Sequence, residues 1–160
     1  MRVGIGYDIH RFGADRALKL GGIEIPEGEG LEGWSDADCL LHAICDALLG
    51  AAGLGDIGQH FPNNDPEFRG ADSIDLLGRV SSMVSRAGYR VVNVDSTVLA
   101  EEPPLAHYRD AMKRRIAGAL SIPADAVGVK FGTAERLGAI GRMEGISAYA
   151  VCLIEKRAGR

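Results

Sequence analysis

The first ten residues alternate between apolar side chains and small or polar ones. The two sets are Val3, Ile5, Tyr7 and Ile9, and Gly4, Gly6, Asp8 and His10. A period of two is typical of a half-buried β-strand. Glycines weaken a strand and often mark the close approach of another part of the structure. We therefore predict a strand whose Gly-Asp-His face meets something closely.

The segment 34–56, WSDADCLLHAICDALLGAAGLGD, has the strongest helical periodicity of the chain. Its apolar stripe consists of Leu40, Leu41, Ile44, Leu48 and Ala51. Ser35 is predicted as the N-cap, with Asp38 completing a capping box. On another face Asp38, His42 and Asp46 follow one another at intervals of four residues.

The rest of the chain alternates between strand and helix patterns. Strands are expected at 17–26, 90–100, 126–131 and 146–155, and helices at 72–87 and 105–120. Residues 27–30 (EGEG) are predicted as a turn, 53–66 as a turn-rich loop, and 132–145 as a glycine-rich loop with a short helical turn. The pattern predicts one α/β domain over residues 1–160, with a single sheet and without repeats or linkers.

Composition narrows the function. The net charge of −4 argues against binding to nucleic acid or to an anionic membrane surface, so an anionic substrate needs a local source of positive charge. Cys39, Cys45 and Cys152 form no CxxC pair and are expected to be reduced core residues. With no leader pattern and no apolar run near the ~20 residues of a membrane span, the expected location is the bacterial cytoplasm.

Asp8, His10 and His42 are the candidate metal ligands. Asp8 and His10 share one strand face with Cα atoms about 6.5–7 Å apart, close enough to reach one ion. His42 lies mid-helix on a polar stripe and is the natural third ligand. Two imidazoles and one carboxylate form the ligand set of a catalytic zinc site, with Asp38 or Asp46 expected to orient the His42 ring. The alternative is an ordinary D-x-H strand and a structural helix histidine.

Two loops carry further candidate chemistry. GLGDIG (53–58) lacks the GK[ST] ending of a phosphate loop, and Asp56 suits sugar-like hydroxyls; the alternative is a helix C-cap followed by a turn. In the second loop Thr133 and Glu135 suit a phosphate and a second divalent ion, or form an ordinary strand exit. Arg142 is either an anion ligand or simply solvated, and His60 and His107 are assigned no role.

Several longer motifs together resemble the 2-C-methyl-D-erythritol 2,4-cyclodiphosphate synthase family. The motifs are GYDIH (6–10), SDADCLLHAICDALLGAAGLGDIG (35–58), FPNNDPEFRGADS (61–73), NVDSTVLAEEP (93–103), VGVK (127–130) and GR-x-EGI-x-AYAV (141–151). They span nearly the whole chain, and the combination of D-x-H, SD-x-D-x-x-x-H and GLGDIG at this spacing is highly specific.

The resemblance implies an α/β (α+β) fold with a single mixed sheet backed by about three helices. It implies a homotrimer whose sheets face a central channel, with an active site at each subunit interface. The implied reaction is the intramolecular cyclisation of 4-diphosphocytidyl-2-C-methyl-D-erythritol 2-phosphate to the 2,4-cyclodiphosphate, with release of CMP. This is a phosphorus–oxygen lyase step of non-mevalonate isoprenoid biosynthesis. A non-catalytic zinc-tied trimer and a metal-dependent phosphoesterase are the rival hypotheses.

The resemblance also assigns roles by position. Zn²⁺ would be held by Asp8, His10 and His42, and a second cation, Mg²⁺ or Mn²⁺, by Glu135, while Thr133 would be the catalytic transition-state stabiliser. The expected substrate contacts are Asp8, His10, Ser35, Asp56, Ile57, Gly58, Phe61, the loop to Asp65, Ala100, Thr133, Glu135 and Arg142. Departures from the family pattern are Trp34 for His, Pro104 for Lys, Ala139 for an aromatic residue, Met143 for Gly, and Phe131, Gly132 and Ala134 in an Ala/Thr-rich run.

Overall fold

One mixed β-sheet organises the chain in the computed structural model, which describes residues 1–157. The strand order is β2-β1-β5-β3-β4; β3 and β4 are parallel, and the other neighbours are antiparallel. The strands are β1 (Arg2–Leu20), β2 (Ile23–Leu31), β3 (Tyr89–Leu99), β4 (Val127–Gly132) and β5 (Gly145–Lys156).

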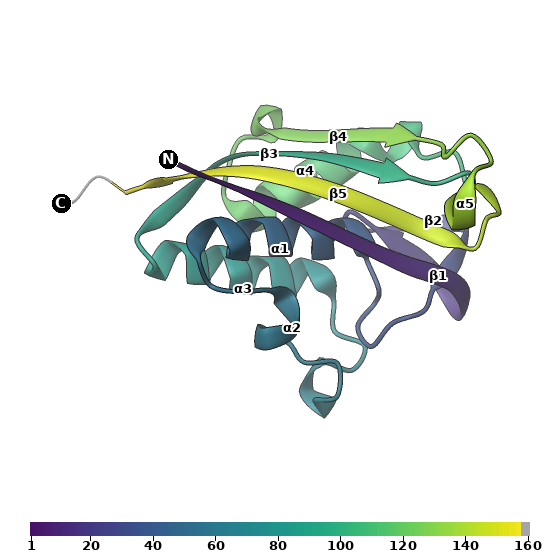
Figure 1. The fold of residues 1–160 in the computed structure, drawn as a ribbon, viewed down its shortest axis with the longest axis horizontal. Helices are drawn as coiled ribbons and strands as arrows, with labels where there is room; N and C mark the ends of the chain where they lie inside the picture. Colours follow the sequence, from purple (N-terminus) through teal and green to yellow (C-terminus); the bar gives the residue numbers. More distant parts are fainter. Residues whose placement is uncertain (158–160) are drawn as a thin grey trace.

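Three long helices cover one face of this sheet (Figure 1). They are α1 (Cys39–Ala52), α3 (Ser73–Arg86) and α4 (Arg109–Leu120); the short helices are α2 (Ile57–His60), α5 (Gly138–Gly141) and the 3₁₀ turns Pro66–Phe68, Ala106–Tyr108 and Ala124–Ala126. The predicted single mixed sheet backed by about three helices is confirmed. The three cysteines are free and buried, as expected. No helix among the described residues is long and apolar enough to span a membrane.

Helix α1 packs directly on the glycine face of β1. A Cβ atom at Gly4 would lie 1.9 Å from the carbonyl oxygen of Ala47, and one at Gly6 would lie 1.9 Å from that of Ala43. These contacts are far below van der Waals distance and involve backbone atoms, which cannot move aside as a flexible side chain can. The predicted close approach is thus confirmed, and its partner is the backbone of the helix that carries His42.

Two local predictions are wrong. Residues 27–30 are not a turn but belong to β2, where they face the second half of β1. The N-cap of α1 is Asp38 and not Ser35: the Asp38 carboxylate accepts a hydrogen bond from the Leu41 amide at 3.1 Å. It also accepts from the amides of Gly21 and Gly22, so one buried side chain fixes both the start of α1 and the β1–β2 turn.

The apolar face of β1 is exposed in the single chain, whereas an alternating pattern usually indicates that the apolar face is buried. Val3 and Ile5 are 68% and 71% exposed, and Tyr149 and Val151 of β5 continue the surface. The Tyr7 and Tyr149 rings lie 4.7 Å apart on it. Because the helices occupy the other face, this surface can be covered only by something outside the described chain.

We expect Gly6→Ala to destabilise the protein by about 3 kcal/mol or more, because its methyl group would clash with the α1 backbone. Gly78→Ala is the matched control: it adds the same methyl group in the middle of α3, where nothing lies within 4 Å. We expect the control to stabilise the fold by about 0.5–1 kcal/mol through helix propensity. Urea unfolding measures both, and equal effects would contradict the close packing of α1.

Candidate metal centre and adjoining cavity

Asp8, His10 and His42 converge at the contact between β1 and α1. The His10 Nε2 and Asp8 Oδ2 atoms are 2.8 Å apart, and Asp8 Oδ2 and His42 Nδ1 are 3.1 Å apart. The third side of the triangle, from His10 Nε2 to His42 Nδ1, is 3.3 Å. These are the only His, Cys, Asp and Glu side chains within residues 1–157 that form a cluster capable of holding a metal ion.

The triangle has the dimensions of one face of a metal-centred tetrahedron. Zinc binds imidazole nitrogen and carboxylate oxygen at about 2.0–2.2 Å, so two ligand atoms at the tetrahedral angle lie about 3.3 Å apart. The observed sides of 2.8–3.3 Å agree with this value. The three residues therefore fit a divalent metal with nitrogen and oxygen ligands.

Hydrogen bonds on the far side of each imidazole ring determine which ring nitrogen faces the candidate metal position. His10 Nδ1–H donates to the Glu32 carbonyl oxygen at 2.6 Å, which leaves Nε2 to face Asp8. His42 Nε2–H has the hydroxyl oxygens of Ser73 and Ser35 at 3.0 and 3.1 Å, which leaves Nδ1 to face Asp8. Each ring thus turns its other nitrogen toward Asp8, where a metal ion can take the place of the proton in the hydrogen bond.

The partner predicted for the His42 ring is wrong. Asp38 is occupied by the helix N-terminus and the β1–β2 turn, and Asp46 accepts a hydrogen bond from the Ile57 amide at 2.8 Å. Ser73 takes their place, and its hydroxyl donates in turn to the buried carboxylate of Asp36. Ser73 is the first residue of α3, so in the sequence it looks like an ordinary residue of a helix start.

The electrostatics of the cluster favour a bound positive charge. Burial alone would raise the pKa of Asp8, but hydrogen bonds from His10 and His42 outweigh it and hold that pKa well below its usual range. Burial alone would lower the pKa of His10, yet the adjacent Asp8 carboxylate raises it above its ordinary value. A site that retains a carboxylate and attracts a proton is also suited to a metal cation.

A cavity of about 540 Å³ opens beside the two histidines. The cavity is lined by several residues that were predicted to contact substrate: His10, Ser35, Ile57, Gly58 and Phe61. Asn63 and Asn64 of the predicted loop from Phe61 to Asp65 also line it, as do Trp34 and Phe68, which were not predicted as site residues. The helix C-cap considered for the GLGDIG motif is confirmed, because Gly53 caps α1 with a left-handed backbone; Ile57 and Gly58 of the same motif form part of the cavity wall.

Two predicted acids serve the loops around the cavity. The Asp56 carboxylate caps α2 by accepting from the Gln59 amide at 3.0 Å. The Asp65 carboxylate accepts from the Glu67 amide at 2.9 Å. In the single chain both carboxylates therefore hold loop backbone in place.

The remaining predicted site residues lie elsewhere in the single chain. Ala100 follows β3 and Thr133 follows β4, toward the edge of the sheet opposite β2. The Thr133 hydroxyl donates to Glu135 at 2.9 Å, and Arg142 pairs with Glu144 at 2.6 Å. None of these residues lines the cavity beside the histidines within the described part of the chain.

Trp34 joins the two loops that border the cavity. Its indole N–H donates to the Asp65 carbonyl oxygen at 2.9 Å, and its own carbonyl accepts from the Gly70 amide at 2.8 Å. The Arg69 guanidinium lies over the indole, 5.6 Å from the ring centre. The resembled family usually has His at this position. Here Trp34 links residues 33–35 to residues 65–70, and we call this set of contacts the clasp.

Comparisons with known proteins all indicate one family. The model of the YgbB family matches residues 1–155. A 2-C-methyl-D-erythritol 2,4-cyclodiphosphate synthase of Syntrophomonas wolfei is 58% identical over 98% of this chain and 99% of its own length. The bifunctional IspDF of Campylobacter jejuni superposes with a TM-score of 0.94 at 39% identity, and this chain spans 98% of itself and 42% of that longer chain. A CDP complex of IspF from Plasmodium falciparum gives a TM-score of 0.85 at 32% identity, covering 98% and 97% of the two chains.

Trp34→Phe tests the clasp, because it keeps the ring and removes the indole N–H. Losing one hydrogen bond of about 1 kcal/mol makes local opening roughly fivefold more frequent. We expect amide hydrogen exchange in residues 62–70 to accelerate by that factor. Tyr108→Phe, which removes the hydroxyl that donates to Glu27 at 2.7 Å, is the control. Unchanged exchange in the loop of the Trp34 variant would show that the clasp does not hold it.

Proposed function

The chain belongs to the YgbB family, and we propose that it is a 2-C-methyl-D-erythritol 2,4-cyclodiphosphate synthase. Its substrate is 4-diphosphocytidyl-2-C-methyl-D-erythritol 2-phosphate. An oxygen of the 2-phosphate attacks the diphosphate phosphorus nearer the methylerythritol, a new P–O–P bond closes the ring, and the bond to CMP breaks. The observation that carries the proposal is the convergence of Asp8, His10 and His42 beside a cavity lined by residues of the SDAD and GLGDIG motifs.

Asp8, His10 and His42 would hold Zn²⁺ as their ligand set suggests, through Asp8 Oδ2, His10 Nε2 and His42 Nδ1. Bound there, the ion would supply a Lewis acid for phosphate oxygens. A structural zinc site has four protein ligands, whereas this cluster provides three. The ligand count therefore supports a site that accepts substrate.

The cavity residues bind and orient the substrate and do not need to ionise it. The attacking 2-phosphate is already anionic at neutral pH, so no strong general base is required. Ile57, Phe61 and Phe68 offer apolar walls to the carbon skeleton and exclude water from the reacting phosphates. Catalysis of such a reaction consists mainly of positioning two phosphates of one molecule against each other and of stabilising the charge that develops on them.

Thr133 and Glu135 would complete the site from a neighbouring subunit. Strand register places Asp8 opposite Ala148, Ala148 opposite Val98, and Val98 opposite Phe131. The loop after β4 therefore lies at the same height along the strands as the metal ligands, but three strand spacings away, about 14 Å. A ring of subunits around an axis parallel to the strands preserves this height, so it can bring one chain's β4 loop to the next chain's metal ligands.

The exposed apolar face of β1 and β5 supports a homotrimer of this kind. Val3, Ile5, Tyr7, Ile9, Tyr149 and Val151 would face the three-fold axis. Glu135 would then bring a second cation, Mg²⁺ or Mn²⁺, to the diphosphate, with Thr133 beside it as the transition-state stabiliser. The backbone from Ala100 would frame the cytidine, and Arg142 would lie near the central channel. The expected location of the enzyme is the bacterial cytoplasm.

The proposed reaction is tested by phosphorus NMR of the products made by the purified protein with Zn²⁺ and Mg²⁺. We expect a cyclic diphosphate together with CMP. His42→Ala should lower turnover by about a thousandfold and remove stoichiometric zinc, because only two ligands remain. His107→Ala, at an exposed histidine 3.4 Å from Glu27, is the control and should retain wild-type turnover. A linear phosphate would indicate a phosphoesterase, and bound zinc without CMP release would indicate a binding protein.

The shared site is tested by mixing two inactive variants. His42→Ala removes the metal-binding half and Glu135→Gln removes the half contributed by the β4 loop, so each homotrimer should be inactive. In a mixed trimer one of the three interfaces joins two intact halves, and random assembly should restore about a quarter of wild-type activity. Sites contained within single chains would give no recovery after unfolding and co-refolding of the mixture.

A further inference from the structure

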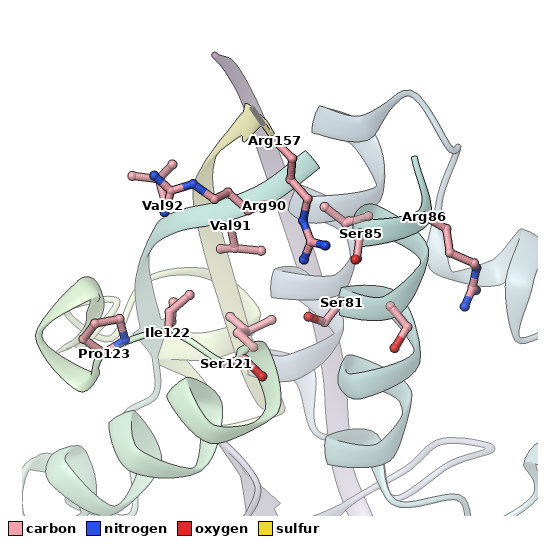
Figure 2. A pocket seen from close by; sticks show the side chains of 13 residues that line it. Ser81, Ser85, Arg86, Arg90, Val91, Val92, Ser121, Ile122, Pro123 and Arg157 are labelled. Carbon is pink, nitrogen blue, oxygen red and sulfur yellow. The ribbon is translucent and has the colours of Figure 1, made fainter. Parts of the chain in front are cut away.

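A second cavity, of about 850 Å³, lies far from the metal centre. It is an open cavity lined by the C-terminal ends of α3 and α4, the beginning of β3, and Arg157 just after β5 (Figure 2). In the sheet register the start of β3 is aligned with Arg2 at the start of β1. Asp8 lies six positions after Arg2 on β1, about 20 Å along the strand, so the two cavities are separate sites.

The charge of this cavity is opposite to that of the whole protein. Its lining contains three arginines and, within residues 1–157, no aspartate or glutamate, whereas the chain carries a net charge of −4. Arg90 forms an ion pair with Glu155, and Arg86 extends away from the cavity (Figure 2). The Arg157 side chain points into it, and its backbone is fixed by a 2.9 Å hydrogen bond from its amide to the Gly88 carbonyl.

Serine hydroxyls line the cavity, with those of Ser81 and Ser85 on the side of the Arg157 guanidinium. Ser81 and Ser85 lie one turn apart on α3, and Ser121 ends α4 across from them (Figure 2). Within the described chain these three hydroxyls have no protein hydrogen-bond partner, whereas Ser82 donates to the Gly78 carbonyl at 3.0 Å. Ser121 has a left-handed backbone with φ of 55°, a position at which helices usually have glycine.

The C-termini of α3 and α4 repel an anion less strongly than their helix dipoles alone would suggest. The carbonyls of Met83 and Ser85 accept from the amides of Ala87 and Gly88, both at 3.0 Å. At the end of α4, the Ser121 and Ile122 amides pair with the carbonyls of the preceding turn at 3.3 and 3.1 Å. Because these carbonyls are satisfied, the arginine and hydroxyl groups dominate the polar wall.

The geometry points to a binding site for a phosphorylated small molecule. The Arg157 guanidinium would pair with the phosphate, the nearby Ser81 and Ser85 hydroxyls would donate to its oxygens, and the Ser121 hydroxyl across the cavity would be available to the rest of the ligand. Val91 and Ile122 form the wall facing these groups and would contact an apolar body attached to the phosphate. This site does not involve the residues proposed to bind the cyclisation substrate.

The test is a titration of the isotope-labelled, zinc-loaded protein with phenyl phosphate, followed by amide NMR shifts. We expect saturable shifts in residues 81–92, 119–123 and 157, and weaker binding of inorganic phosphate, which lacks the ring. Phenol, which lacks the phosphate, should cause no saturable shift at these residues. Shifts that never saturate, equal affinity for inorganic phosphate, or equal shifts with phenol would overturn the proposal.

Two matched substitutions identify the cationic group. Arg157→Gln should weaken phenyl phosphate binding about tenfold or more, because it removes a charge-assisted pair. Arg86→Gln makes the same change in charge on a side chain that leaves the cavity, and should change affinity less than twofold. Equal losses in both variants would show only general attraction to positive charge. Neither residue lies in the cyclisation site, so CMP release should stay at the wild-type level and reports on the two proposals separately.

Discussion

The contact of α1 with the glycine face of β1 is the constraint on which the rest of the site depends. Gly4 and Gly6 let the helix backbone approach so closely that even a methyl group would collide with the Ala47 and Ala43 carbonyls. His42 precedes Ala43, and Asp8 and His10 continue the strand face beyond Gly6. The same close packing that holds the helix therefore sets the 2.8–3.3 Å separations of the three ligand atoms. A larger helix–strand distance would leave two half-sites on separate elements.

Hydrogen bonds from three other parts of the chain then fix the ring orientations. The Glu32 carbonyl selects the His10 tautomer, and Ser73, held by Asp36, selects that of His42. Asp38 anchors the start of α1 to the β1–β2 turn, so the helix cannot shift along the strand without breaking buried hydrogen bonds. The metal centre is thus positioned by backbone packing first and by polar contacts second. Trp34 adds a hydrogen bond that joins the loops at the edge of the cavity.

A single chain holds two chemically complementary sets of groups that do not meet. Nitrogen and oxygen ligands with an adjoining cavity lie on β1 and α1, whereas the hydroxyl and carboxylate of Thr133 and Glu135 follow β4. The bare apolar face of β1 and β5 gives a physical reason for self-association, since its exposed surface needs a partner. Self-association and the completion of the proposed site then have the same origin.

Local patterns in the sequence determined the elements, the strand that carries Asp8 and His10, the helix that carries His42, and the likeness of its motifs to one enzyme family. Strand and helix periodicities can be recognised within a few residues, and potential metal ligands can be identified from residue type alone. Only the tertiary structure decided which face of β1 is buried, because that depends on a helix backbone some forty residues later. It also decided that Asp38 caps α1 instead of Ser35, that Ser73 and not Asp38 or Asp46 orients His42, and that EGEG continues a strand. Each of these outcomes is a competition between distant groups for one hydrogen bond or one packing face, and no local pattern records which group is nearer in space.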